Sequence, residues 1–335
     1  MNRKQIRRIA AILLALALQI TILPGCSRSY EPEEGKLSIV CTIFPQYDWV
    51  RQILGDRAES FELALLLNNR IDLHSYQPTV DDIVRVSTCD LFIYVGGESD
   101  GWAYELLKGA ANKDMIVINL LGVLGDSAKE EEILEGMEEE EPEDEGGYDG
   151  EIEYDEIEYD EHVWLSLRNA VVFCAAIAEA LSSLDADGAE QYRNNLSAYA
   201  ALLQALDIEY QAAIGEAPVK TLLFGDRFPF RYLTDDYGLT PYAAFSGCSA
   251  ETEAGFDTIV FLANKVDELG LKTVMVTESA DQSIAATIIN NTEYKNQRIL
   301  VLDAMQSVSS SDIQNGAAYL SIMESNLNVL REALG

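Results

Sequence analysis

The chain has 335 residues, 48% of them hydrophobic, and a formal net charge of −34 at pH 7. Its length and apolar content are sufficient for two folded domains. So strong a negative charge repels nucleic acid and attracts cations, which excludes nucleic acid as a partner.

The N-terminus has the pattern of a secretory signal. Four basic residues lie within the first eight positions, and an uncharged apolar run follows from Ile9 to Leu23. The run ends in Leu-Pro-Gly-Cys, which is typical of cleavage before a cysteine that receives a diacylglyceryl group. We predict a signal peptide over residues 1–25, lipidation of Cys26, a tether over 26–36, and a location on the outer face of the cytoplasmic membrane. The alternative is an uncleaved membrane anchor, although the apolar run is short for a full span.

Strand and helix patterns alternate through the first part of the chain, which predicts an N-terminal lobe over residues 37–165. Thr79 and Asp82 have the spacing of a capping box at the start of one helix. The order of elements favours a parallel sheet with helices on both faces. The expected strands cover residues 36–44, 60–67, 91–97 and 115–120, and the expected helices cover 46–54, 79–87 and 102–110.

A long acidic segment interrupts this pattern. Between Glu130 and Glu161 there are 19 Asp and Glu residues and no Lys or Arg. Such a segment is too charged to pack, and we expect a disordered surface loop over residues 126–161. Its simplest role is solvation, and the alternative is weak capture of metal ions at many sites.

A second α/β pattern follows two helical segments. Residues 166–216 contain an apolar helix over 167–184 and a longer amphipathic helix over 189–214. The expected strands then cover 220–225, 240–245, 272–278 and 298–304, with helices over 229–236, 256–269, 281–291 and 312–334. The predicted fold class is α/β, with two lobes of mainly parallel sheet joined by one long helix. The C-terminal lobe covers 217–335, and a metal site is expected in the cleft between the lobes.

The only two histidines, His74 and His162, lie in loops that we expect to face this cleft. Ligands of open α/β sheets bind beyond the carboxyl ends of the strands. Polar groups follow two further strands there, Asp226 beside Arg227 and Glu278 near Asp281. Two imidazoles with one or two carboxylates would form a mixed nitrogen and oxygen site for a first-row divalent metal.

An imidazole that binds a metal needs an orienting partner on its other ring nitrogen. Asp72 and Asp160 each lie two residues before a histidine and are candidates for this role. The four cysteines after the tether, Cys41, Cys89, Cys174 and Cys248, contain no close pair. We expect buried free thiols.

Three stretches of the chain carry a resemblance to a known family. "IVCTIFPQYDWVRQILGDRAE", "LHSYQPTVDDIVRVSTCDLFIYVGG" and "DEHVWLSLRNAVVFCAAIAEAL" occur in this order. They resemble the opening strand and helix, the "PHSYEPTPSDI" region and the "DPHVWLDPxNA" motif of the cluster A-I solute-binding proteins of zinc and manganese ABC importers. The resemblance extends from Leu37 to the C-terminus.

The resemblance implies a monomeric receptor that is not an enzyme and that delivers its cargo to an ABC permease and ATPase. It maps His74 and His162 onto the first two metal ligands. The third ligand position falls on Asp226 or Arg227, of which only the carboxylate can bind a metal. The fourth falls on Glu278 or Asp281. The cargo is Zn²⁺ or Mn²⁺, and zinc is favoured because it binds such ligands more tightly.

Three rival interpretations remain at this level. A degenerate receptor would bind an anionic or organic ligand through Arg227 instead of a metal. A surface adhesin would keep the receptor fold. A metallohydrolase would use an open metal position to activate water, but the chain has no H-E-x-x-H motif and no obvious general base.

Overall fold

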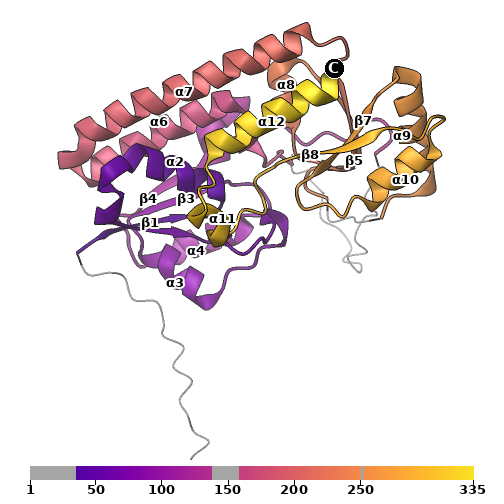
Figure 1. Ribbon diagram of the computed structural model, residues 1–335. Helices are drawn as coiled ribbons and strands as arrows, with labels where there is room; N and C mark the ends of the chain where they lie inside the picture. The colour runs from indigo at the N-terminus through magenta and orange to yellow at the C-terminus, as the bar shows by residue number, and fades with distance from the viewer. Residues whose placement is uncertain (1–34, 138–157, 250–252) are drawn as a thin grey trace, which may run out of the picture. The chain divides into compact units, whose positions relative to one another are not determined.

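The computed structural model describes residues 35–137, 158–249 and 253–335. The signal peptide, Cys26 and most of the tether lie outside these residues, as does the middle of the acidic segment. The described part contains two four-stranded sheets with helices around them (Figure 1). All the strand pairs in both sheets are parallel, which confirms the predicted α/β class.

The first sheet and its helices, called the first lobe here, follow the predicted order of elements. Helix α2 packs against β1 and β2 on one face, and α3 and α4 lie together on the other. The strand order is β2-β1-β3-β4. The elements are β1 (Leu37–Cys41), α2 (Phe44–Leu54), β2 (Phe61–Leu65), α3 (Val80–Thr88), β3 (Leu91–Tyr94), α4 (Gly101–Gly109), β4 (Ile116–Asn119) and α5 (Leu120–Leu124).

The second sheet repeats this topology and, with α8, α9 and α10, forms the second lobe. Its strand order is β6-β5-β7-β8. Helices α9 and α10 pack against each other and against this sheet. The elements are β5 (Thr221–Phe228), α8 (Arg231–Tyr237), β6 (Thr240–Ser246), α9 (Phe256–Leu269), β7 (Thr273–Thr277), α10 (Ser283–Asn291) and β8 (Arg298–Leu302).

Burial explains why these strands read as continuous apolar runs. Every residue of β3 and of β7 is buried, because helices cover both faces of a parallel sheet. The edge strand β8 is more exposed. The predicted capping box is confirmed at α3, where Thr79 and Asp82 exchange side-chain to backbone hydrogen bonds of 3.0 and 3.2 Å.

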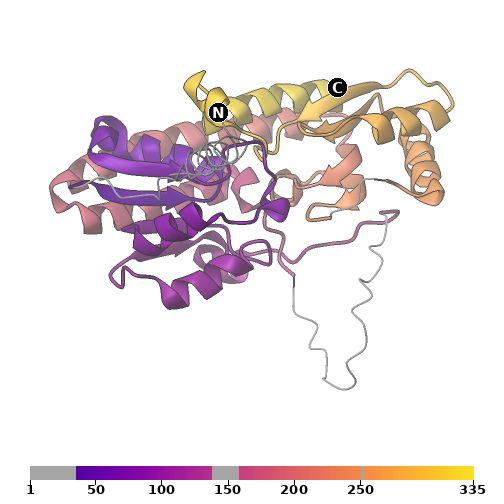
Figure 2. The same cartoon turned by 90° about the horizontal axis from the view of Figure 1, so that it is seen from below.

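A long helix follows the first lobe, as the amphipathic pattern predicts. Helix α7 (Ala189–Glu216) runs beside α6 (Leu167–Leu184) and also contacts α2, α8 and α12 (Figure 2). The buried Tyr210 on α7 donates a hydrogen bond to the carbonyl of Met323 at 2.6 Å. The helix therefore packs against elements from both halves of the chain.

The final helical segment differs from the prediction. One helix was expected over 312–334, but α11 (Ser310–Gln314) and α12 (Tyr319–Leu334) are separate. Gly316 has a φ of +95°, which breaks the helix between them. Ser310 N donates to the carbonyl of Asn68 at 3.0 Å, so the chain returns to the first lobe at α11.

The ends of the acidic segment are ordered, which corrects the prediction of a disordered loop over the whole of 126–161. The backbones pair where Glu131 N donates to Glu158 O at 2.8 Å and Asp160 N donates to Lys129 O at 2.9 Å. Asp160 and Glu161 are each only 2% exposed. Residues 138–157 lie outside the described part.

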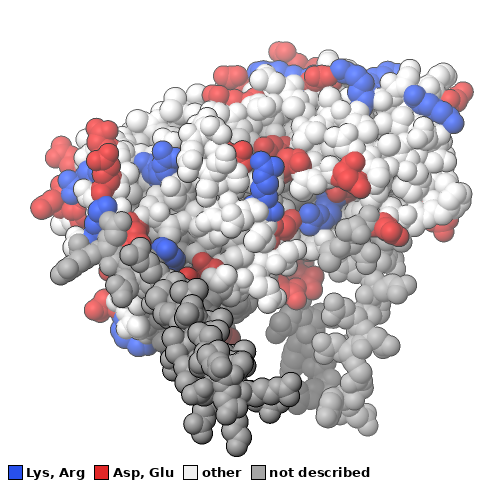
Figure 3. All heavy atoms as spheres, turned by 60° about the horizontal axis from the view of Figure 1, so that its bottom comes forward, with Lys and Arg blue, Asp and Glu red and all other residues white. Residues whose placement is uncertain are grey.

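Acidic and basic side chains are interspersed on the face shown in Figure 3. Twelve of the acidic residues fall in the undescribed stretch 138–157. A large part of the chain's negative charge therefore belongs to the acidic segment.

Candidate metal centre

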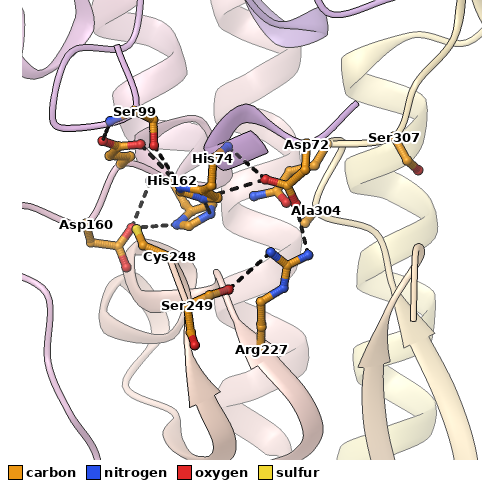
Figure 4. A network of polar contacts seen from close by, with 12 residues as sticks. Asp72, His74, Ser99, Asp160, His162, Arg227, Cys248, Ser249, Ala304 and Ser307 are labelled. Atoms are coloured by element: carbon orange, nitrogen blue, oxygen red, sulfur yellow. Dashed lines mark hydrogen bonds and ion pairs between the residues drawn. The ribbon is translucent and has the colours of Figure 1, made fainter. Parts of the chain in front are cut away.

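The two histidines lie side by side in the polar network shown in Figure 4. His74 lies in a 3₁₀ turn that follows β2, and Asp72 caps this turn by accepting the His74 N–H at 3.0 Å. His162 directly precedes a second 3₁₀ turn, Val163–Leu165, which leads into α6. The Nε2 atoms of the two rings are 3.2 Å apart.

This separation is the one that a shared zinc ion requires. Tetrahedral zinc with bonds of about 2.0–2.1 Å to imidazole nitrogens holds two such nitrogens about 3.3 Å apart. The His162 side chain is fully buried and that of His74 is 11% exposed. Both Nε2 atoms are therefore in position to bind one ion without a large rearrangement.

The outer ring nitrogens have partners that fix the orientation of the two rings. Nδ1 of His162 lies 3.1 Å from Oδ1 of Asp160, as predicted for an orienting carboxylate. Nδ1 of His74 lies 2.8 Å from the Ser99 hydroxyl and 3.6 Å from Oε2 of Glu161. Ser99 and Glu161 thus occupy the place on His74 that we expected for Asp72.

The surroundings favour a neutral His74. Burial and the neighbouring His162 lower the pKa of His74 to about 4. Burial also acts to lower the pKa of His162, but the Asp160 carboxylate outweighs it and the net shift is upward. Burial raises the pKa of Glu161 to about 7. At neutral pH the His74 ring therefore has a lone pair free to bind a metal.

Asp226 lies outside the histidine cluster in the structure. The pairing of β5 with β6 shifts register between Phe224 and Arg227, and such a bulge redirects the side chains that follow it. The Asp226 carboxylate accepts a hydrogen bond from Thr277 N at 2.9 Å and another from the Thr277 hydroxyl. Asp226 therefore joins β5 to β7.

Glu278 and Asp281 also have other partners. Glu278 accepts hydrogen bonds of 2.8 to 3.2 Å from three backbone N–H groups between Ala304 and Ser307. Asp281 is exposed and accepts the Ser283 N–H at 2.9 Å at the start of α10. The structure thus uses Glu278 to hold the segment after β8 and Asp281 to begin a helix.

Arg227 reaches from the second lobe to the first. Its Nη2 lies 2.9 Å from Oδ2 of Asp72, and its Nη1 donates to the Ser249 carbonyl at 3.4 Å. Burial acts to raise the pKa of Asp72, but Arg227 and His74 make the net shift downward. An anionic ligand at Arg227 would have to displace this carboxylate.

Cys248 is a further residue at the site that the sequence pattern does not indicate. Among the described residues, the ligand atoms of His74, His162 and Cys248 form a group in which all lie within 4.8 Å of one another. Cys248 follows β6 and is half-buried, whereas the other three described cysteines are buried. One feature of the sequence could have indicated Cys248: it follows a predicted strand and lies in the polar stretch "SGCSAE".

Burial and the nearby Glu131 and Asp160 carboxylates raise the pKa of the Cys248 thiol. The metal-free protein therefore keeps this thiol protonated at neutral pH. A bound dication reverses this effect, because a coordinating thiol loses its proton.

Comparison with known proteins identifies similar chains. Residues 39–333 match the family model described as "Zinc-uptake complex component A periplasmic". The chain is 30% identical to the zinc-binding lipoprotein AdcA of Streptococcus pneumoniae over 320 residues, which cover 96% of this chain and 60% of AdcA. It is 27% identical to the high-affinity zinc uptake system protein ZnuA of Bacillus subtilis over 327 residues, 96% of this chain and 97% of ZnuA.

Among solved structures, the Zn(II)-bound ZnuA-like domain of Streptococcus pneumoniae AdcA is similar with a TM-score of 0.67 and 28% sequence identity. The match covers 90% of this chain and 99% of that domain. The chain thus spans about 60% of the length of the AdcA relatives and nearly all of their ZnuA-like domain.

Proposed function

The chain belongs to the family of periplasmic zinc-uptake components, and we propose that it is an extracytoplasmic receptor that captures one zinc ion at His74 and His162 and delivers it to an ABC permease. Proteins of this family bind solutes for ABC transporters and are not enzymes. The observation that carries the proposal is the 3.2 Å separation of the two Nε2 atoms.

Zinc is the favoured cargo over manganese. Imidazole nitrogens suit zinc, and the affinity of such ligands rises from Mn²⁺ towards Zn²⁺. The Nδ1 atoms of both rings are already hydrogen-bonded. The two imidazoles are therefore held in the orientation for binding before the ion arrives. Manganese prefers oxygen ligands, whereas the group of candidate ligand atoms among the described residues consists of two imidazole nitrogens and a thiol sulfur.

Release of the ion requires that the two lobes loosen their contacts near the histidines. Arg227 pairs with Asp72, and the Trp164 ring nitrogen donates to the Ala304 carbonyl at 2.8 Å. The long helix α7 packs on elements of both halves and opposes a wide hinge motion. We therefore propose that loops around the site move during release, while the helices stay in place.

The membrane anchor belongs to the same proposal, with Cys26 as the lipidated residue. Replacing Cys26 by alanine should move the protein from the membrane fraction to the medium or periplasm. Fractionation and immunoblotting measure this change, and retention of the variant in the membrane would point to an uncleaved anchor.

Calorimetric titration of the metal-free protein with Zn²⁺ and then Mn²⁺ tests the binding function. We expect one tight zinc site, with sub-micromolar affinity, that the His74→Ala/His162→Ala variant lacks. Manganese should bind more weakly. Weak binding at several sites, equal in both proteins, would show that the acidic segment is the only metal binder and would overturn the proposal.

Uptake is tested in cells that lack the gene. The wild-type chain should restore growth at limiting zinc, and the double histidine variant should not. If both proteins restored growth, zinc transport would not depend on the histidine pair.

A further inference from the structure

The geometry points to Cys248 as the third ligand of the metal, a thiolate from the second lobe that completes the site begun by His74 and His162. This inference rests on the proposed function, because it needs a metal at the two histidines. Cys248 is not one of the positions onto which the resemblance maps the remaining ligands, Asp226 or Arg227 and Glu278 or Asp281.

The sulfur is within reach of an ion held by the histidines. Zinc bonds of about 2.3 Å to sulfur and about 2.05 Å to nitrogen place tetrahedral sulfur and nitrogen ligands about 3.6 Å apart. The Cys248 sulfur lies no more than 4.8 Å from the ligand nitrogens of His74 and His162. A shift of about 1.2 Å or less closes the site, and rotation of a half-buried side chain supplies it.

The backbone around Cys248 is held against the histidines from several directions. Gly247 packs so closely that an added Cβ would lie 3.0 Å from Cε1 of His162. Cys248 N donates to Oε1 of Glu131 at 3.1 Å. The next carbonyl, that of Ser249, accepts from Arg227. The loop after β6 is thus positioned by contacts with the site and with the ordered end of the acidic segment.

The setting of Cys248 differs from that of the other described cysteines. Cys41, Cys89 and Cys174 belong to the apolar core of the chain and are at most 1% exposed. Cys248 is half-buried among imidazoles and carboxylates, with no disulfide partner in the described part of the chain. A thiol gains little from packing there, whereas it would be an effective ligand.

A thiolate ligand also bears on which metal the protein selects. Thiolate sulfur is a soft donor that suits zinc, whereas manganese favours carboxylate and water oxygens. Two imidazoles and one thiolate would supply three of the four ligands of tetrahedral zinc and leave one position open. Because His74 belongs to the first lobe and Cys248 follows a strand of the second, the ion would join the lobes directly.

Cobalt(II) substitution tests this assignment, because cobalt bound to a thiolate shows an intense sulfur-to-metal charge-transfer absorption in the near ultraviolet. Titration of the metal-free wild-type protein should produce this band together with visible d–d bands, saturating at one equivalent. Cys248→Ser should lose the charge-transfer band and lower zinc affinity at least about 10-fold, since loss of a partner that only orients a ligand already costs about 10- to 100-fold. Cys89→Ala, which removes a core thiol, should keep the band.

A second variant separates a ligand role from a structural one. Cys248→His supplies another zinc ligand and should bind zinc more tightly than Cys248→Ser, while the charge-transfer band stays absent. Saturating d–d bands without charge transfer in the wild type would overturn the Cys248 assignment and leave the proposed function standing. No stoichiometric binding of cobalt or zinc in the wild type would overturn both.

Discussion

Replacing Gly247 with alanine should weaken zinc binding without unfolding the protein. An alanine Cβ at this position would lie 2.9 Å from the Phe228 carbonyl oxygen, and 3.0 and 3.1 Å from Cε1 and Nδ1 of His162. Favourable contacts between such atoms begin at about 3.5 Å, so the backbone or the imidazole must retreat by roughly 0.5 Å. The φ of Gly247 lies outside the left-handed region, so alanine causes no backbone strain there. The effect of the substitution comes from the steric overlap of the added Cβ with its neighbours.

A displacement of this size is large for a binding site. Metal and catalytic sites hold their geometry to within about 0.5 Å. We therefore expect zinc affinity to fall about 10- to 100-fold, which corresponds to about 1.4 to 2.7 kcal/mol of binding free energy. Overpacking at one position costs about 1 to 3 kcal/mol of stability, which leaves a protein of this size folded in most cases.

Calorimetric titration with zinc measures the affinity, and urea unfolding of the metal-free protein measures stability. The matched control is Gly215→Ala in α7, where an added Cβ meets nothing within 4 Å. This control should bind zinc as the wild type does and be slightly more stable, because alanine favours a helix over glycine. Wild-type zinc affinity in folded Gly247→Ala would refute the argument that this loop is pressed against the metal centre.

Three further outcomes are expected. Asp160→Ala removes the partner of His162 Nδ1 and should lower zinc affinity about 10- to 100-fold in calorimetry; unchanged affinity would mean that the ring needs no orienting carboxylate. Tyr210→Phe leaves the Met323 carbonyl without its buried hydroxyl donor and should lower the urea unfolding free energy by about 1 to 2 kcal/mol, which an unchanged midpoint would contradict. Burial raises the pKa of Asp100 from 3.8 to about 6. The folded protein therefore binds this proton more tightly than the unfolded chain does. The resulting stabilisation is fully present below about pH 4 and is lost as the pH rises through 6. The unfolding free energy of the metal-free wild type should thus fall by about 2 to 3 kcal/mol relative to Asp100→Asn between pH 4 and 6, and a constant difference would contradict this.

The sequence by itself determined the elements, because their signals are local. Buried parallel strands appear as short apolar runs, as at β3 and β7. The capping box at Thr79 and Asp82 depends on residues three positions apart. The amphipathic spacing of α7 required no knowledge of its partners. The two histidines stood out by their rarity and by the strands they follow.

Local signals did not show how charged groups pack. The acidic segment read as uniformly solvated, yet Asp160 and Glu161 are buried at its end, where they face the histidines. A carboxylate is buried only when partners offset the loss of hydration, and those partners are distant in the chain. Ser99, which contacts both His74 and Glu161, is such a partner.

Only the tertiary structure decided which side chains accompany the histidines. A bulge in β5 turns Asp226 towards Thr277 and lets Arg227 reach Asp72, and one shifted residue in a strand reverses which side chain faces the site. Cys248 lies 86 positions from His162, and it reaches the site because β6 ends beside it. Helices and strands follow from neighbours in the chain, whereas a metal centre assembled from several loops depends on contacts that no local pattern contains.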